Sequence, residues 1–301
     1  MKKGLIWGGF GALLLIGIVS GYAPDLMLAR DLAAAREEGL LTLPPARTVA
    51  KEDDAKPMYL AARSKHASAA MRLITHFSSE AKTPSSEVLA YLRAVSAGSS
   101  RPRCSRLEAA NVEMGGYSLT SDLYQAAKFI EVRATDETSL LPAAQIARHL
   151  GMQNDILASG YGAILTSRML DHAAKLNLPV DARQRIVNAI GPLPDPREVL
   201  RRHIAETVGL MEMSAQEQGR SASRIRREGD YLRFWRGFFA SARQGGGFVK
   251  AMEGNDAKIR DAEVRANQYT DPGRLTGRRN EPWSAWGTLI EKANARLAAG
   301  R

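Results

Sequence analysis

One stretch of the chain places several arginines among aromatic side chains, between residues 220 and 239. Guanidinium groups bind phosphate and carboxylate oxygens, and aromatic rings favour the headgroup level of a membrane. The pattern is therefore typical of a segment that contacts an anionic surface, most simply anionic lipid. The residues that would make this contact are Arg220, Arg224, Arg227, Arg233, Arg236 and Trp235. The alternative is a helix whose rings enter the protein core and whose arginines are solvated. We favour this alternative because large aromatic side chains stabilise proteins mainly through burial.

Three shorter patterns match parts of catalytic or metal-binding motifs and lack the rest. His203 and Glu206 have the i, i+3 spacing of a metal site in a helix bundle, but no second such pair accompanies them, so a surface ion pair is favoured. Ser79-x-x-Lys82 matches the acylation motif of penicillin-recognising enzymes without its companion elements. Residues 209–211, Gly-Leu-Met, lack the preceding Glu-Ser of lytic transglycosylases. The sequence therefore predicts no catalytic residue, no metal ligand and no cofactor, and a non-enzymatic protein is favoured over an enzyme.

Apolar residues recur at intervals of three and four over most of the chain, which predicts α-helices. A helix after Pro24 carries Leu28, Leu32 and Ala35 on one face and ends at Gly39. A long helix from Pro57 carries His66 on its apolar face, where a hydrogen-bonded core histidine is expected. The three most regular stripes are Leu119, Leu123, Ala126 and Ile130; Leu140, Ala144 and Ala147; and Ile156, Gly160, Ala163, Ser167, Leu170 and Ala174. The final stripe consists of Trp283, Trp286, Ile290, Ala293 and Leu297.

No stretch of alternating polarity is long enough to predict a strand, so the predicted fold class is all-α. We expect an N-terminal transmembrane helix, then antiparallel helical hairpins that form a bundle or a tetratricopeptide-like stack, then a basic C-terminal helical region. The predicted domains are an anchor at 1–23, a juxtamembrane helix and linker at 24–56, a helical-hairpin domain at 57–214, and a basic arginine/aromatic region at 215–301.

Three segments of the chain carry a resemblance to other proteins. They are AREEGL, DDAKPMY and LLPAAQIARHLGMQNDILASGYGAILTSRMLDHA. Together they resemble a set of uncharacterised membrane-anchored proteins that is abundant in planctomycete-type bacteria, with an alanine-rich helical-hairpin region. The resemblance covers about residues 25–178. It implies an N-terminal anchor followed by helical hairpins, and it implies no activity because the shared motifs are packing motifs.

Residues 4–23 contain no charged side chain and follow Lys2 and Lys3. About 20 helical residues span the hydrocarbon core of a bilayer, so this stretch predicts a single-pass anchor. Because lysine and arginine concentrate on the cytoplasmic side, we expect the lysine pair inside and the chain from about Pro24 exported across a bacterial inner membrane. The alternative is a cleaved signal peptide, with a mature terminus at Tyr22.

The net charge is +10, and most of the excess lies after residue 200. A basic surface suggests an anionic partner, and in an exported protein we expect anionic lipid rather than nucleic acid. Cys104 is the single cysteine, so core packing rather than an internal disulfide must hold the fold. The sequence predicts an extracytoplasmic helical scaffold or interaction protein with a protein partner or a second copy of itself. A cell-envelope enzyme, with a site assembled from distant residues, is the alternative.

Overall fold

The computed structural model describes residues 23, 25–42, 49–105, 107, 119–153, 156–219, 221–244, 248–267 and 283–300. All regular secondary structure in these ranges is helical, which confirms the predicted all-α class. Within the same ranges, one isolated parallel β-bridge joins Asp54 to Arg103. None of the described helices combines the length and the apolar character that crossing a membrane requires. Apart from Ala23, the predicted anchor at 1–23 lies outside the described residues.

The chain divides into two compact units, and each unit is assembled from two separate parts of the sequence. Unit 1 comprises residues 1–44 and 201–285, and unit 2 comprises residues 45–200 and 286–301. The boundary falls at residues 200/201 rather than at the predicted 214/215. The reason is that the apolar side chains of Ile204, Val208 and Met211, all buried, belong to the core of unit 1. The last helix likewise leaves the predicted C-terminal domain, because its residues from Trp286 onward belong to unit 2.

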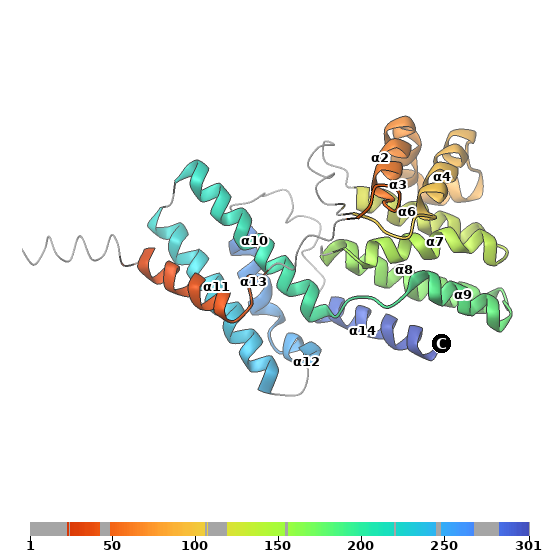
Figure 1. Cartoon of the computed structure of the whole chain (residues 1–301). Coiled ribbons are helices and arrows are strands. Elements are labelled where there is room, and N and C mark those ends of the chain that lie inside the picture. Colours follow the sequence, from red (N-terminus) through yellow and green to blue (C-terminus); the bar gives the residue numbers. More distant parts are fainter. Residues whose placement is uncertain are drawn as a thin grey trace, which may run out of the picture. The chain divides into compact units, whose positions relative to one another are not determined.

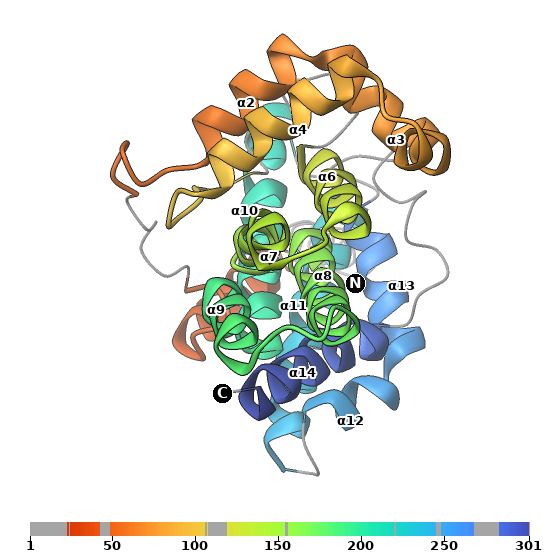
Figure 2. The same cartoon turned by 90° about the vertical axis from the view of Figure 1, so that its right-hand side faces the viewer.

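Unit 2 consists of consecutive helices that pack against their neighbours along the chain (Figure 1). These helices are α2 (Lys56–Lys65), α3 (Ala67–Lys82), α4 (Ser86–Ser99), α6 (Leu119–Arg133), α7 (Glu137–Gly151), α8 (Ile156–Lys175) and α9 (Val180–Ile190). The C-terminal helix α14 (Trp283–Ala299) adds Ile290, Ala293 and Leu297 to the core, as its stripe predicts. The most extensive contact is between α7 and α8, which are seen nearly end-on in Figure 2.

Gly162 of α8 allows the close approach of α7 and α8. A Cβ atom added to Gly162 of α8 would lie 2.3 Å from the Cα and N atoms of Gly151 on α7. The two backbones therefore approach more closely than any residue with a side chain would permit. Small residues dominate the predicted stripe of α8, and Gly160 and Ala163 are buried as expected, whereas Ala174 at its end is exposed.

The predicted long helix from Pro57 is broken. His66 has φ −128° and ψ 43°, which ends α2 and precedes α3. Ala62, Ala69 and Leu73 are buried on either side of this break. His66 itself is only half-buried, so the expected core histidine is not at this position. The periodic pattern continues through the break because both helices bury an apolar face against the same core.

Unit 1 contains a helix over residues 25–37 together with α10 (Pro196–Gln218, in unit 1 from Arg201), α11 (Ala222–Gln244), α12 (Phe248–Glu253) and α13 (Asp256–Asn267). Leu28, Leu32 and Ala35 are buried, which confirms the stripe expected for the first helix. α11 packs against α12 and α13.

The helix over 25–37 ends at Gly39 in a Schellman motif. Gly39 has φ +70°, a left-handed conformation that glycine adopts without steric cost. The amide of Leu40 donates to the Ala35 carbonyl at 2.9 Å, and the amide of Gly39 donates to the Arg36 carbonyl at 3.0 Å. This 6→1 and 5→2 pair defines the motif. It buries Leu40 and leaves the Glu38 side chain exposed at the helix end.

Candidate functional site

The aromatic residues of the stretch 220–239 form the core of unit 1. Trp235 has no exposed surface, and Phe238 and Phe239 are also buried. The Trp235 ring centroid lies 5.1 to 6.2 Å from those of four neighbouring aromatic residues. Phe248 of α12 extends the cluster with centroid distances of 5.7 and 6.0 Å to Phe238 and Phe239. The core interpretation of these rings is therefore the one that the structure supports, and Trp235 does not lie at a surface.

Arg224 is a buried structural residue. Its Nε donates to Glu228 Oε1 at 3.1 Å, and its Nη2 donates to the Met211 carbonyl at 3.1 Å. Arg224 and Glu228 are 4% and 5% exposed, so this ion pair within α11 lies inside unit 1. The hydrogen bond to Met211 joins α11 to α10. A buried, paired guanidinium cannot reach a membrane surface. Arg220 lies outside the described residues.

Arg233 and Arg236 pair with acidic side chains of the first helix of unit 1 and of the turn that follows it. Arg233 Nε lies 3.2 Å from Asp31 Oδ2, and its Nη2 lies 2.9 Å from Asp230 Oδ1. Arg236 binds Glu38 with Nε 3.0 Å from both carboxylate oxygens and Nη2 2.6 Å from Oε1. Hydrogen bonding to Glu38 raises the pKa of Arg236 above its ordinary value. Arg227 is half-buried and donates to the Ser223 carbonyl at 3.1 Å. Contact with anionic lipid therefore rests on Arg227, Arg233 and Arg236, and it stays a prediction.

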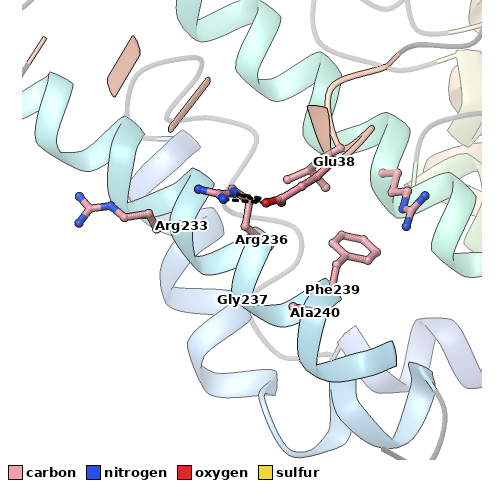
Figure 3. Close-up of a pocket in the computed structure, with 8 residues that line it drawn as sticks. Glu38, Arg233, Arg236, Gly237, Phe239 and Ala240 are labelled. Atoms are coloured by element: carbon pink, nitrogen blue, oxygen red, sulfur yellow. Dashed lines mark hydrogen bonds and ion pairs between the residues drawn. The ribbon is translucent and has the colours of Figure 1, made fainter. Parts of the chain in front are cut away.

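A cavity of about 440 Å³ lies beside these ion pairs, and we call it the arginine pocket. Its lining residues are Glu38, Leu40, Arg201, Arg233, Arg236, Gly237, Phe239 and Ala240. In Figure 3 the Arg236 guanidinium is directed at the Glu38 carboxylate, and the Phe239 ring extends from the next turn of α11. Charged and apolar groups therefore line the same cavity, which is typical of a site for an amphipathic small molecule.

Arg201 is the residue of the arginine pocket that sequence reasoning missed. Its guanidinium carbon lies 5.0 Å from the centroid of the Phe239 ring, within cation–π distance. Its Nε is buried and has no hydrogen-bond partner. Within the described part of the chain, no carboxylate lies within ion-pair distance of this side chain. A buried N–H group without an acceptor is uncommon in folded proteins.

Several polar contacts in unit 2 join pairs of helices. Arg63 Nε of α2 lies 2.6 Å from Asp122 Oδ2 of α6, and the two side chains are 8% and 1% exposed. Burial raises the pKa of Asp122 to about 6, and the nearby Arg63 opposes this shift. Arg168 of α8 donates from Nε to Glu131 Oε2 of α6 at 2.7 Å.

His149 on α7 is the core histidine of unit 2. Its Nε2 lies 2.9 Å from the Arg101 carbonyl, and its Nδ1 lies 2.8 Å from the Tyr59 hydroxyl. Because a carbonyl can only accept, Nε2 carries the proton, and Nδ1 accepts from Tyr59. Burial lowers the pKa of His149 to about 4, so the ring is neutral at neutral pH. Within the described ranges, no three histidine, cysteine or acidic side chains gather closely enough to hold a metal ion.

The charge pattern contains a weak signal for the ion pairs of unit 1. Asp31 and Glu38 are seven residues apart and Arg233 and Arg236 are three apart, so each pair lies on one face of its helix. This spacing indicates charged faces of opposite sign, but 198 residues separate Glu38 from Arg236. Arg201 gave no signal, since nothing in its local sequence distinguishes it from Arg202. Comparisons with protein-family models, with curated proteins and with solved structures found no match to this chain.

Proposed function

We propose that this protein is a helical scaffold or interaction protein, anchored by residues 4–23 on the outer side of a bacterial inner membrane. Support for the anchor comes from the uncharged stretch between Lys3 and Asp25. The excess of lysine before the stretch supports the inside-to-outside orientation. The resemblance to uncharacterised membrane-anchored proteins with helical hairpins belongs to the same proposal.

The observation that carries the scaffold role is a set of three polar contacts between helices of unit 2. Arg63–Asp122 joins α2 to α6, Glu131–Arg168 joins α6 to α8, and Tyr59–His149 joins α2 to α7. Each group is held by a partner on another helix. A side chain held in this way orders the packing of helices, and such polar contacts favour one defined arrangement. In this proposal α6, α7 and α8 form a stack of antiparallel hairpins whose outer surface receives a protein partner or a second copy of the chain.

The topology is tested with C-terminal fusions of alkaline phosphatase and of a green fluorescent protein to the full chain. We expect phosphatase activity in intact cells and no fluorescence, because only the phosphatase folds to its active form outside the cytoplasm. A fluorescent, phosphatase-negative pair would overturn the orientation. Mass spectrometry of the purified chain distinguishes an anchor, with residues 1–23 retained, from a signal peptide cleaved before Tyr22.

The scaffold role is tested by crosslinking in intact cells, followed by purification of the full chain in detergent. We expect one recurrent partner or a crosslinked homo-oligomer, and a matched variant with Gly162→Ala, which disturbs the α7–α8 contact, should lose it. Turnover of peptidoglycan or lipid by the purified protein would contradict the scaffold role and favour the envelope enzyme.

A further inference from the structure

The first helix of unit 1, over residues 25–37, exposes large apolar side chains only in its first turn. Leu26 and Met27 are 71% and 54% exposed. The residues exposed further along this helix, which is red in Figure 1, are short or charged: Ala29, Arg30, Ala33, Arg36 and Glu37. Two exposed apolar residues are ordinary on a protein surface. Their position in the chain is what makes them informative.

Leu26 and Met27 follow closely on the uncharged stretch of residues 4–23. The chain from Ala23 to Asp25 extends at most about 7 Å, and the two helical residues after Asp25 add about 3 Å. The polar zone on each side of the hydrocarbon core is about 5–8 Å thick. Side chains of a helix tilt towards its N-terminus, here towards the uncharged stretch. If residues 4–23 span a bilayer, both side chains therefore lie within reach of the headgroup zone.

The same part of the helix belongs to the core of unit 1. Leu28, the residue after Met27, is buried, and Leu32 continues the buried face. Asp31 pairs with Arg233 of α11, with Oδ2 3.2 Å from Nε. The helix is therefore held by unit 1 within one turn of Met27, and no flexible linker separates the exposed apolar residues from the folded unit.

We propose that unit 1 rests directly on the outer face of the membrane, with Leu26 and Met27 inserted at the boundary between headgroups and acyl chains. Asp25, exposed at the start of the helix, limits the insertion to this boundary because its charge must stay hydrated. Arg30, exposed one turn further on, then lies at the level of the lipid phosphates, which a guanidinium binds. This inference rests on the anchor proposed above and does not depend on the scaffold role.

The depth of both positions is measured by electron paramagnetic resonance on the full chain in vesicles of phosphatidylethanolamine and phosphatidylglycerol. Cys104→Ala removes the single cysteine, and Leu26→Cys or Met27→Cys then carries a nitroxide label. The matched control is Val180→Cys, because Val180 is also apolar, is 70% exposed and belongs to unit 2.

The measured quantity is the collision rate of the label with oxygen, divided by its collision rate with a water-soluble nickel chelate. Oxygen concentrates in lipid and the chelate is excluded from it. We expect this ratio to be severalfold higher at positions 26 and 27 than at position 180. Both labelled side chains are exposed, so the label leaves the core intact, and equal helical content by circular dichroism checks this.

Flotation of the same vesicles in alkaline carbonate separates this proposal from the anchor. If the protein floats with the vesicles and the ratios at Leu26→Cys and Met27→Cys equal that at Val180→Cys, unit 1 stands away from the membrane. The proposal is then wrong, while the anchor stands. If the protein does not float, residues 4–23 do not hold it in the bilayer, and the anchor and this proposal fail together.

Discussion

Two buried side chains of unit 2 respond to pH in opposite directions. Burial raises the pKa of Asp122 to about 6 and lowers the pKa of His149 to about 4. The ordinary values are 3.8 for the aspartate and 6.5 for the histidine. Between pH 4 and pH 6, Asp122 is therefore protonated in the folded protein and ionised in the unfolded chain. In the same range, His149 is neutral in the folded protein and protonated in the unfolded chain. These two effects on the free energy of unfolding largely cancel.

Replacing Asp122 by Asn should expose the effect of His149. With Asp122 removed, the free energy of unfolding should rise from pH 4 to pH 6.5 by about 2–3 kcal/mol, since one pKa unit corresponds to about 1.4 kcal/mol. The baseline should fall at all pH values because Arg63 loses its buried partner. Urea unfolding across this range measures both changes. Glu291→Gln, an exposed position on α14, is the control. A pH profile of Asp122→Asn parallel to that of the wild type would contradict the assignment.

Replacing His149 by Gln should produce the opposite slope. The amide retains a donor for the Arg101 carbonyl and has no titration in this range. The contribution of Asp122 then remains, so the free energy of unfolding should fall as pH rises from 4 to 6. Above pH 6.5 the free energy of unfolding of both variants, Asp122→Asn and His149→Gln, should no longer change with pH through these two groups. The same urea titrations check this, and a rising profile in His149→Gln would show that another group dominates.

At the scale of elements, the α7–α8 contact depends on the absence of a side chain. Gly162→Ala would place a Cβ 2.3 Å from backbone atoms of Gly151, and neither backbone can move without displacing its helix. We expect destabilisation of about 1–3 kcal/mol or more, the cost of overpacking in a core. Differential scanning calorimetry measures this as a lower Tm.

Gly209→Ala serves as the counterpart of this variant. Gly209 lies inside α10, and nothing lies within 4 Å of its added Cβ. Alanine should stabilise the helix there by about 0.5–1 kcal/mol, because it reduces the conformational freedom of the unfolded chain. Equal Tm values for Gly162→Ala and Gly209→Ala would refute the close approach of α7 and α8.

At the scale of the whole molecule, unit 2 is completed by residues that follow unit 1 in the sequence. Ile290, Ala293 and Leu297 of α14 are buried in unit 2, and Asn294 forms two hydrogen bonds with the backbone of Leu193 at 2.9 and 3.1 Å. Trp286 Nε1 donates to Ser159 Oγ at 3.3 Å. A folding unit that stops at residue 200 therefore lacks part of its own core.

A fragment of residues 45–200 should be less stable than the same fragment joined by a flexible glycine–serine linker to residues 283–301. The side chains of Ile290 and Leu297 each contribute about 1.5–3 kcal/mol on burial, so the difference should amount to several kcal/mol. Thermal unfolding followed by circular dichroism measures it. The linked fragment with Ile290→Ser and Leu297→Ser is the control. Equal melting temperatures for the linked and unlinked fragments would show that α14 is not part of this core.

Local periodicity was sufficient to predict which faces of several helices are buried. Leu28, Leu32 and Ala35 lie in the interior, as do Leu119 and Leu123. Gly39 was expected to end its helix, and the Schellman motif there is the mechanism. These features depend on residues within one or two helical turns, so the sequence carries them directly.

Only the tertiary structure decided which charged and polar side chains meet. Glu38 lies 198 residues from Arg236 in the sequence. The residues of one helix do not indicate which other helix it will pack against. Contacts between distant segments also determine several other features. They are the arginine pocket, the break at His66, the position of the core histidine at His149 and the boundary within α10. The sequence alone determined that the chain is helical and which stripes are apolar. Packing decided which apolar stripes share a core and which arginines form ion pairs. The reason is that an ion pair or a close helix contact depends on two surfaces, and the local sequence describes only one of them.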